Sequence, residues 1–414
     1  MPNNNSGGPS KCPYIMSTNP MQLVPRPHQE RGDVAMQQHD KGQIIVPTGG
    51  GKTLNMIMDT LRQFQSQTPQ TIVVVCPRIL LAEQLSSEFL EHIVDPMVRV
   101  LHVHSGETHH ESTTNSNTIR QWVDTHNSRH QLIITTYNSL QRLVDAEIDV
   151  DTIFFDEAHN SVKRNFFPAT EHFSANANRC YFFTATRKTS VTPSKSGMND
   201  VDVYGNIICR VSAPELVKGG YIVAPKIIAK RFQVMDGKQI TAECDSSNLL
   251  ETLDEIDCKK ILVCVKSAKQ LINLVSQTDC ITKLQSRGYS YLYITSKTGA
   301  VVDGKKVDRE VFFDTLNAWG RDSNKKFVCL HRSILSEGIN VSELEAVVFL
   351  RNMDVIELTQ TIGRVLRKGG KDKVWGLCVV PVYSKVGIAT ERALQGVVDA
   401  VFERGELLDS VVRR

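Results

Sequence analysis

A short glycine-rich segment between a strand-like run and a helix-like run most limits what this chain can fold into. The apolar, β-branched run Gln43-Ile44-Ile45-Val46 is typical of a buried strand. It is followed by Pro47-Thr48-Gly49-Gly50-Gly51-Lys52-Thr53 and by a helix-compatible stretch over residues 54–64. A glycine-rich turn leaves backbone N–H groups free to bind phosphate, and the positive end of the helix dipole adds to the attraction. The segment therefore predicts a phosphate-binding loop.

The residues of this loop have separate expected tasks. Lys52 would reach the β and γ phosphates, and the Thr53 hydroxyl would ligate Mg²⁺. Val46 stands where such loops usually carry glycine, but the strand–turn–helix context is intact. A glycine-rich hairpin turn is the alternative, and it does not explain a Lys-Thr pair at the start of a helix. The remaining nucleotide-binding residues of the loop would be Thr48, Gly49, Gly50 and Gly51.

A second chemical signal, Asp156 and Glu157, follows the apolar run Thr152-Ile153-Phe154-Phe155. Sheets of α/β proteins bind ligands at the carboxyl ends of their strands. Asp156 would hold Mg²⁺, and Glu157 would orient and deprotonate an attacking water. An ordinary acidic turn is the alternative, but a phosphate loop upstream makes it the weaker interpretation. Together the two segments predict that the chain binds and hydrolyses a nucleoside triphosphate.

The composition is that of a globular protein with a modest net charge. Of the 414 residues, 41% are hydrophobic and 22% are charged, which is ordinary for a soluble protein of two or three domains. The net charge of +3 does not by itself require a nucleic-acid partner, so any basic surface must be local. No apolar run approaches the length of a membrane span, so we expect no membrane partner.

The ten cysteines bear on the cellular compartment. None of them forms a C-x-x-C pair, and several lie in apolar strand-like runs, as Cys76 and Cys264 do. This pattern favours buried thiols in a reducing compartment over disulfides or a zinc site. The His109-His110 pair lies in a polar stretch and is interpreted as surface loop. We expect an intracellular, cytoplasmic location, with a nucleoid or a viral replication site as alternatives.

Strand-like runs alternate with helix-like runs from residue 43 onward. The alternation predicts an α/β fold with mostly parallel sheets flanked by helices. Residues 188–202 are polar and predict a loop, and residues 389–414 look helical. A second series of apolar strands begins near Lys226 without a second phosphate loop, which predicts two domains with a cleft between them. The expected divisions are a disordered tail over residues 1–20, a first domain over 21–214 and a second domain over 215–414.

A later segment, Gln360-Thr361-Ile362-Gly363-Arg364-Val365-Leu366-Arg367, follows an apolar run in the second domain. With the phosphate loop and Asp156-Glu157-Ala158-His159 before it, this segment resembles superfamily 2 helicases of the DEAD/DEAH-like group. The resemblance implies two tandem RecA-like domains with ATP in the cleft between them. It also implies that Arg364 and Arg367 reach the γ-phosphate as arginine fingers, with Gln360 in the same catalytic set. A basic amphipathic surface helix is the alternative interpretation.

The resemblance assigns further roles at the nucleotide. Arg26-Pro27-His28-Gln29 resembles the segment that reads adenine, so Gln29 would pair with the adenine edge. Gly338 lies in a segment that resembles one spanning both nucleotide and nucleic acid, although Asn340 replaces the usual Asp there. The residues expected to couple hydrolysis to strand movement are His159, Thr184 and Thr186.

Residues at strand ends of both domains resemble segments that contact the nucleic-acid backbone. Hydroxyls, backbone N–H groups and basic side chains at these positions suit phosphate contacts that do not read sequence. Taken singly, the segments of the first domain are better explained as strand-end turns. The expected contacts are Pro77, Arg78, Thr135, Thr136, Lys266, Ser267, Thr295 and Ser296.

Within superfamily 2, the chain looks most like restriction-enzyme-type motors, including type III restriction helicases. Asn199-Asp200 with Val203-Tyr204-Gly205 supports this branch, as does the run from Gly363 to Lys368. Little length remains for a nuclease or target-recognition domain. We therefore expect a minimal, monomeric motor core, with a nuclease or recognition protein as a possible partner subunit.

The leading hypothesis is a helicase or translocase that uses ATP and Mg²⁺ to move along or unwind nucleic acid, with DNA favoured over RNA. A second is the motor subunit of a restriction, defence or remodelling complex, which translocates without unwinding. A third is an ATP-gated clamp or sensor on nucleic acid. The full set of lysine, acidic and arginine residues argues against the clamp.

Overall fold

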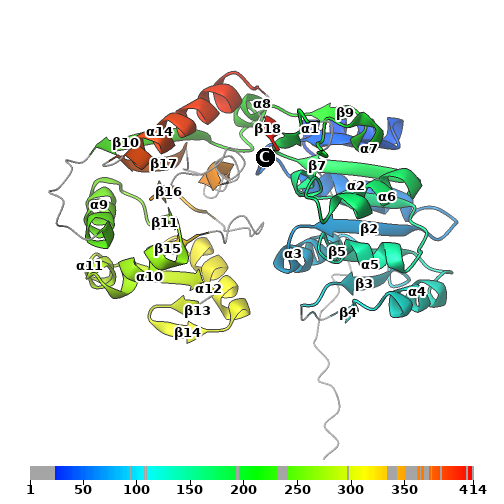
Figure 1. Ribbon diagram of the computed structural model, residues 1–414, viewed down its shortest axis with the longest axis horizontal. Coiled ribbons are helices and arrows are strands. Elements are labelled where there is room, and N and C mark those ends of the chain that lie inside the picture. The colour runs from blue at the N-terminus through cyan, green and yellow to red at the C-terminus, as the bar shows by residue number, and fades with distance from the viewer. Residues whose placement is uncertain are drawn as a thin grey trace, which may run out of the picture.

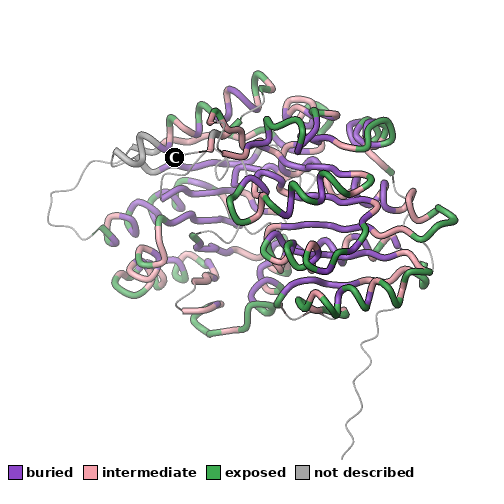
Figure 2. Tube along the Cα trace, turned by 45° about the vertical axis from the view of Figure 1, so that its right-hand side comes forward, coloured by how far each residue is buried: buried purple, intermediate pink, exposed green. Residues whose placement is uncertain are grey.

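The computed structural model of the chain has two lobes, each built around a β-sheet (Figure 1). Helices cover the faces of the sheets, and the strands between them are the most buried part of the trace (Figure 2). The structure describes residues 24–93, 95–106, 108, 110–192, 195–231, 241–295, 298–332, 343–350, 361–363, 365–367, 373, 375–382, 385–406 and 409–412.

The sheet of the first lobe has the spatial order β4-β3-β5-β2-β6-β7-β1-β9, and every neighbouring pair is parallel. Its strands are β1 (Lys41–Ile45), β2 (Thr71–Cys76), β3 (Arg99–Val103), β4 (Glu111–Ser112), β5 (Gln131–Thr136), β6 (Thr152–Phe155), β7 (Arg179–Thr184) and β9 (Ile207–Arg210). Its helices are α1 (Pro27–Gln38), α2 (Lys52–Gln63), α3 (Ile79–Leu90), α4 (Ser116–Thr125), α5 (Leu140–Asp145), η1 (Ala158–Asn160), α6 (Phe167–Asn176), α7 (Val201–Tyr204) and α8 (Ala213–Lys218).

The central strands of this sheet are nearly continuous apolar runs because both of their faces are covered. In β2, every residue from Ile72 to Cys76 is buried. Alternate residues belong to different apolar clusters, Val74 and Phe154 to one and Val73 and Phe155 to the other. A parallel strand covered on both faces needs no polar alternation. The structure therefore confirms the predicted α/β class with mostly parallel sheets.

The sheet of the second lobe has the order β10-β17-β16-β11-β15-β12-β13-β14, and its pairs are parallel except for the two that involve β13. Its strands are β10 (Ala224–Arg231), β11 (Lys260–Cys264), β12 (Ser290–Thr295), β13 (Gly299–Val302), β14 (Lys305–Val307), β15 (Phe327–His331), β16 (Ala346–Phe349) and β17 (Trp375–Val382). Its helices include α9 (Thr241–Glu255), α10 (Ala268–Ser276), α11 (Cys280–Ser286), α12 (Arg309–Arg321) and α14 (Lys385–Val397). None of the helices that the structure describes is long and apolar enough to cross a membrane.

The C-terminal part of the chain departs from the predicted all-helical stretch. Helix α14 continues into a π-helical turn, η3 (Val398–Glu403), and the chain then forms β18 (Asp409–Val411). Strand β18 pairs in parallel with β8 (Arg187–Thr189), which lies in the stretch predicted to be a loop. Both strands are short, so their existence depends on a partner distant in sequence. The C-terminal segment thus returns to the first lobe.

The strand register brings the predicted catalytic segments to one edge of the first sheet. Ile45 at the end of β1 pairs with Thr184 of β7, and Phe155 at the end of β6 pairs with Phe182 of β7. Because these strands are parallel, the segments that follow them meet at the same edge. The fold therefore places the phosphate loop beside Asp156.

Candidate active site

The predicted phosphate loop connects β1 to α2 and requires glycine in its backbone. Gly49 and Gly51 have φ of 87° and 82°, in the left-handed region that favours glycine. A Cβ on Gly50 would collide with the side chain of Val46. Val46, which replaces the usual first glycine, is itself buried and packs beneath the loop. The loop therefore forms a tight turn that no side chain obstructs.

Helix α2 begins at Lys52 directly after the loop, and no side chain caps its N-terminus. The N–H groups of an uncapped helix N-terminus, together with the helix dipole, attract anions. Lys52 and Thr53, which are predicted to hold phosphate and Mg²⁺, both line the cavity in front of this terminus. The start of α2 is thus arranged to receive a negatively charged group.

Asp156 and Glu157 follow β6 and lie beside Lys52. The Nζ atom of Lys52 is 3.3 Å from Oε1 of Glu157. Burial, and then the charge of Glu157, raise the pKa of Asp156 to about 7, while Lys52 offsets part of that shift. A nearby divalent cation would favour the ionised form of such a carboxylate. Asp156, with the hydroxyl of Thr53 as a second oxygen ligand, therefore fits a site for Mg²⁺.

A cavity of about 490 Å³ lies in front of these residues, within the size range of small-molecule sites. Buried polar atoms on its lining that have no hydrogen-bond partner among the described residues include Nη1 of Arg26, Oγ1 of Thr48 and Nε of Arg367. Buried polar groups nearly always find partners, so these atoms indicate a ligand that accepts hydrogen bonds. Two guanidinium groups, Lys52 and a helix N-terminus together favour a polyanion such as a triphosphate.

The predicted arginine segment of the second lobe packs directly on the phosphate loop. A Cβ on Gly363 would collide with Cβ of Thr48, so a residue with a side chain could not make this contact without displacing the loop. The backbone N–H of Val223 donates to the carbonyl of Leu366 at 2.8 Å, which anchors the segment, and Arg367 reaches the cavity. Three other predicted nucleotide-site residues lie outside the described part of the chain: Gln360, Arg364 and Gly338.

Gln29, which is predicted to read adenine, has its amide engaged by the protein backbone. Its Oε1 accepts from the N–H of Arg26 at 2.8 Å, and its Nε2 donates to the carbonyl of Gly51 at 3.0 Å. Gln29 thus ties α1 to the phosphate loop. Arg26 and Tyr221 line the cavity, with the guanidinium carbon of Arg26 4.8 Å from the ring centroid of Tyr221. Sequence reasoning named Arg26 only as part of the segment that reads adenine and did not name Tyr221, because their distance along the chain hides the contact.

The predicted coupling residues form a buried hydrogen-bonded set. The Thr184 hydroxyl donates to the carbonyl of Thr186 at 2.9 Å and lies 3.1 Å from Nδ1 of His159. Since the hydroxyl hydrogen of Thr184 is already used, Nδ1–H of His159 is the donor in the second bond. Burial lowers the pKa of His159 to about 4, so its imidazole is neutral at pH 7. The set joins the acidic segment to the end of β7.

The nucleic-acid contacts predicted in the first lobe differ in accessibility. Arg78, the N-cap of α3, is exposed, and Pro77 beside it is half-buried. Thr135 and Thr136 are both buried. The hydroxyl of Thr135 donates to the carbonyl of Val103 at 3.0 Å, so it supports the sheet in this conformation. Arg78 is thus the residue of this group that is open to a partner.

The contacts predicted in the second lobe show the same division. Lys266 is exposed, whereas the hydroxyl of Ser267 caps α10 by accepting from the N–H of Gln270 at 3.0 Å. Oγ1 of Thr295 lies 2.7 Å from Oγ1 of Thr298. Ser267 and Thr295 therefore have local structural roles, and Ser296 lies outside the described residues.

A basic cluster of Arg78, Lys163 and Lys188 lies on the first lobe and was not identified from the sequence. Burial, followed by the charges of Lys188 and Arg78, lowers the pKa of Lys163, so both of these cations lie near Lys163. Nζ of Lys163 bonds to Oδ1 of Asn160 at 2.7 Å rather than to a carboxylate. Gathered like charges attract an anionic partner such as a phosphate backbone. The three residues come from separate elements, so their spacing along the chain carries no signal.

Comparison with known families and structures agrees with this geometry. Residues 21–189 match the family model of the type III restriction enzyme res subunit. Residues 246–369 match the helicase conserved C-terminal domain. No curated protein sequence matches the chain.

Several solved structures share the two-lobed arrangement. The ATP-dependent type ISP restriction-modification enzyme LlaBIII bound to DNA has a TM-score of 0.72 and 16% identity, over 95% of this chain and 32% of that chain. A nuclease-deletion mutant of the type ISP enzyme LlaGI with a DNA substrate mimic has a TM-score of 0.65 and 18% identity, over 93% of this chain and 30% of that chain. Dbp5 of S. cerevisiae, bound to RNA and ADP BeF3, has a TM-score of 0.58 and 17% identity, over 94% and 90%. The chain thus spans about a third of the length of the two restriction enzymes.

At these identities the structural matches establish the fold, two RecA-like lobes in tandem. The family models add that one matched helicase region carries the phosphate loop and the acidic segment, and the other carries the arginine segment. The chain is therefore a superfamily 2 helicase of the restriction-enzyme type, an ATP-hydrolysing nucleic-acid motor.

Proposed function

We propose that this motor moves along DNA by closing and opening its lobes around ATP, with residues 21–214 as the first motor domain and 215–414 as the second. The contact of Gly363 with Thr48, which brings Arg367 into the cavity, carries the proposal. Because Arg367 belongs to the second lobe, hydrolysis requires closure of the two lobes. One ATP then drives one cycle of closing and opening.

Lys52 changes partner in this cycle. Its Nζ lies 3.3 Å from Oε1 of Glu157. A bound triphosphate offers Lys52 a more highly charged partner, which releases Glu157 to orient the attacking water and take its proton. Arg367, with Arg364 and Gln360 in the same segment, offsets the charge that develops on the γ-phosphate. ATP binding would therefore exchange the acid–lysine contact for a lysine–phosphate contact.

Mg²⁺ is the metal cofactor that this chemistry implies, and Thr53 and Asp156 are the residues that would hold it. Bound there, the ion supplies positive charge to the phosphate oxygens. Oxygen ligands are those that Mg²⁺ prefers. Burial and the charge of Glu157 raise the pKa of Asp156, and a cation beside it would offset both effects. Backbone groups of Gly49, Gly50 and Gly51 would hold the phosphates, and Gln29 would face the adenine after a change of partner.

Coupling to the track would run through His159. Its hydrogen bond to Thr184 links the acidic segment to the end of β7. Thr186 lies two residues before Lys188, so the coupling set is continuous in sequence with the basic cluster. A shift of the acidic segment on hydrolysis would therefore move the cations that grip the backbone. Phosphate contacts of this kind hold a strand without reading its sequence.

The rate of ATP hydrolysis tests this proposal. It is measured with Mg²⁺ and with no nucleic acid, single-stranded DNA, duplex DNA or RNA. We expect the strongest stimulation by DNA, and we expect Arg367→Ala to lower the stimulated rate by about 10³-fold or more. An unstimulated rate with every polymer, or a stimulated rate that survives in Arg367→Ala, would overturn the proposal.

Movement on duplex DNA without strand separation is the second candidate. A strand-displacement assay beside a triplex-removal assay separates the two activities. Removal of a triplex strand without displacement of a duplex strand identifies a translocase, and displacement identifies a helicase. An ATP-gated clamp would do neither, but would remain on DNA in an ATP-dependent manner.

A further inference from the structure

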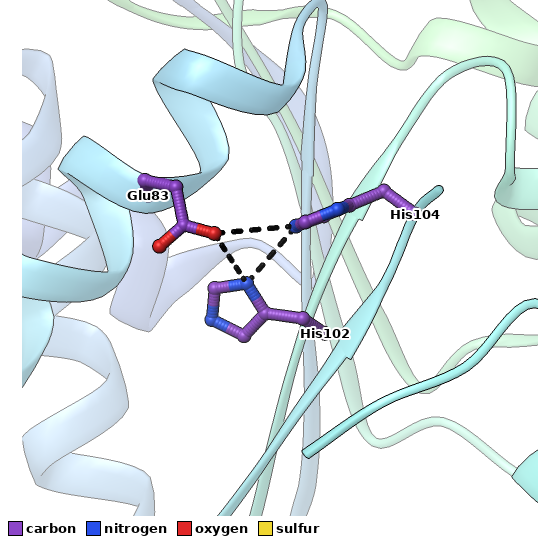
Figure 3. A group of neighbouring side chains, drawn as sticks. All are labelled: Glu83, His102 and His104. Atoms are coloured by element: carbon purple, nitrogen blue, oxygen red, sulfur yellow. Dashed lines mark hydrogen bonds and ion pairs between the residues drawn. The ribbon is translucent and has the colours of Figure 1, made fainter. Parts of the chain in front are cut away.

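Two histidines and a glutamate converge on the first lobe (Figure 3), and none of the three lines the ATP cavity. His102 lies on β3, His104 follows the end of β3, and Glu83 projects from α3 toward both imidazoles. His102 and His104 are buried. Nδ1 of His102 lies 3.0 Å from Nε2 of His104. Oε1 of Glu83 lies 3.5 Å from the first nitrogen and 3.7 Å from the second.

These distances are those of ligand atoms around one small cation. In a tetrahedral zinc site with bonds of about 2.1 Å, ligand atoms lie about 3.4 Å apart, and the distances of 3.0, 3.5 and 3.7 Å bracket that value. Oε1 of Glu83 is a buried atom without a hydrogen-bond partner among the described residues, and it faces the two nitrogens. A buried carboxylate oxygen in this position is well placed to bind a cation.

The charges of the three side chains suit a divalent ion. Burial alone would raise the pKa of Glu83, but its contacts with His102 and Thr108 hold that pKa below its usual value, so the carboxylate is ionised. Burial, and then His102, lower the pKa of His104, so its imidazole is neutral at pH 7. Metal ions bind the neutral form of imidazole and the ionised form of a carboxylate.

Each histidine has a further contact at its other ring nitrogen. Nε2 of His102 lies 3.0 Å from the hydroxyl of Ser86, an outer contact that would orient a ligating imidazole. Nδ1 of His104 accepts from the N–H of Gly106 at 3.3 Å. Without metal, Nε2–H of His104 then donates to Nδ1 of His102. A metal ion would take the place of the proton on Nε2 of His104. That proton would move to Nδ1 of His104, where it would replace the weak hydrogen bond from the N–H of Gly106.

We propose that Glu83, His102 and His104 bind one divalent transition-metal ion, with zinc as the preferred occupant and water at a fourth position. Two imidazoles and one carboxylate are a ligand set that zinc takes with an open position. The hydroxyl of Thr108 also lies beside the cluster, 3.5 Å from Nδ1 of His102.

The ion would join α3 to β3. Helix α3 begins directly after Arg78 of the basic cluster, and it carries Gln84 and Glu88 to the ATP cavity. A metal bridge at Glu83 would fix this helix relative to the sheet. The site is therefore a structural link between the basic cluster and the nucleotide cavity, and it takes no part in hydrolysis itself.

Metal analysis of the full chain tests the proposal. Protein treated with EDTA and desalted is titrated with Zn²⁺ in the presence of excess Mg²⁺, which keeps zinc away from the Asp156 site. Bound zinc is counted by mass spectrometry, and Co²⁺ is used as a visible probe of tetrahedral geometry. We expect one zinc per chain, tetrahedral Co²⁺ absorption and a rise in the melting temperature with zinc.

The variants Glu83→Gln and His104→Gln should each weaken zinc binding. Loss of a residue that only hydrogen-bonds to a metal ligand weakens binding roughly 10- to 100-fold, and loss of a ligand itself should have at least that effect. Each should melt like the metal-free wild type and show no rise with zinc, which separates lost ligation from lost folding. His172→Gln on α6 removes an exposed histidine and is the control. Less than one equivalent of bound zinc, or wild-type zinc affinity in both variants, would overturn the proposed site. The cluster would then be a hydrogen-bonded histidine pair that binds no metal.

Discussion

Replacement of Asp156 by Asn measures how much the ionised carboxylate of Asp156 lowers the free energy of unfolding when no cation is bound. Burial and the charge of Glu157 raise the pKa of Asp156 from 3.8 to about 7. The folded state therefore binds this proton more tightly than the unfolded chain does. Stability from this group is fully present below pH 3.8 and is lost as the pH rises to about 7. A pKa difference of about three, at about 1.4 kcal/mol each, amounts to about 4 kcal/mol above pH 7.

Asn has nearly the size of Asp and cannot ionise, so the variant does not lose this stability as the pH rises. We expect Asp156→Asn to be more stable than the wild type by about 4 kcal/mol at pH 8 and by about 1 kcal/mol at pH 4.5. The free energy of unfolding is measured with urea in EDTA at a series of pH values. Groups that do not interact with Asp156 cancel in the difference, which leaves the contribution of Asp156 and of its coupling to neighbours such as Glu157.

The matched control is Asp202→Asn, which removes an exposed carboxylate from the same lobe. It should change the free energy of unfolding by less than about 0.5 kcal/mol at every pH. Mg²⁺ with a non-hydrolysable ATP analogue should stabilise the wild type and leave Asp156→Asn largely unchanged. A variant less stable than the wild type at pH 8, or a difference that does not vary with pH, would refute the reasoning.

Three further predictions concern other parts of the site. Gly363→Ala should reduce stimulated ATP hydrolysis because its methyl group would collide with Thr48, whereas Gly396→Ala, with nothing within 4 Å, should not; steady-state rates of the two variants decide this. Burial lowers the pKa of His159 to about 4. The free energy of unfolding of the wild type should therefore fall by about 1.4 kcal/mol per pH unit, relative to His159→Asn, as the pH falls from 6.5 toward 4. Urea unfolding of both proteins checks this slope. Lys163→Ala should weaken binding to single-stranded DNA and lower the slope of log affinity against log salt by about 1; an unchanged slope would remove Lys163 from the interface.

The strands of both sheets could be predicted where the chain is buried on two faces. After their first residues, β2 and β11 are continuous apolar runs because helices cover both sides of their sheets, so composition alone marks them. β4 and β18 could not be predicted in this way. They are two and three residues long, and each depends on a partner strand that its own sequence does not specify.

The residues of the candidate site also differ in whether their own segment of sequence determines their role. Lys52 and Asp156 could be predicted because each lies in a short segment whose local geometry determines its chemistry. Arg26, Tyr221 and the Glu83 cluster could not, because their partners come from separate elements. The buried hydroxyl of Thr135 shows the opposite error, since a strand-end position does not reveal whether a side chain faces solvent or the sheet.

The unpartnered atoms of the cavity suggest why nucleotide binding and lobe closure are linked. Nη1 of Arg26 belongs to the segment before α1, Oγ1 of Thr48 to the phosphate loop and Nε of Arg367 to the second lobe. Leaving such a group buried without a partner costs about 1–3 kcal/mol, and more when it is charged. A single triphosphate that satisfies all three atoms would recover that energy only while the lobes stay together. Its hydrolysis would remove the shared partner, and the same unsatisfied groups would then favour opening.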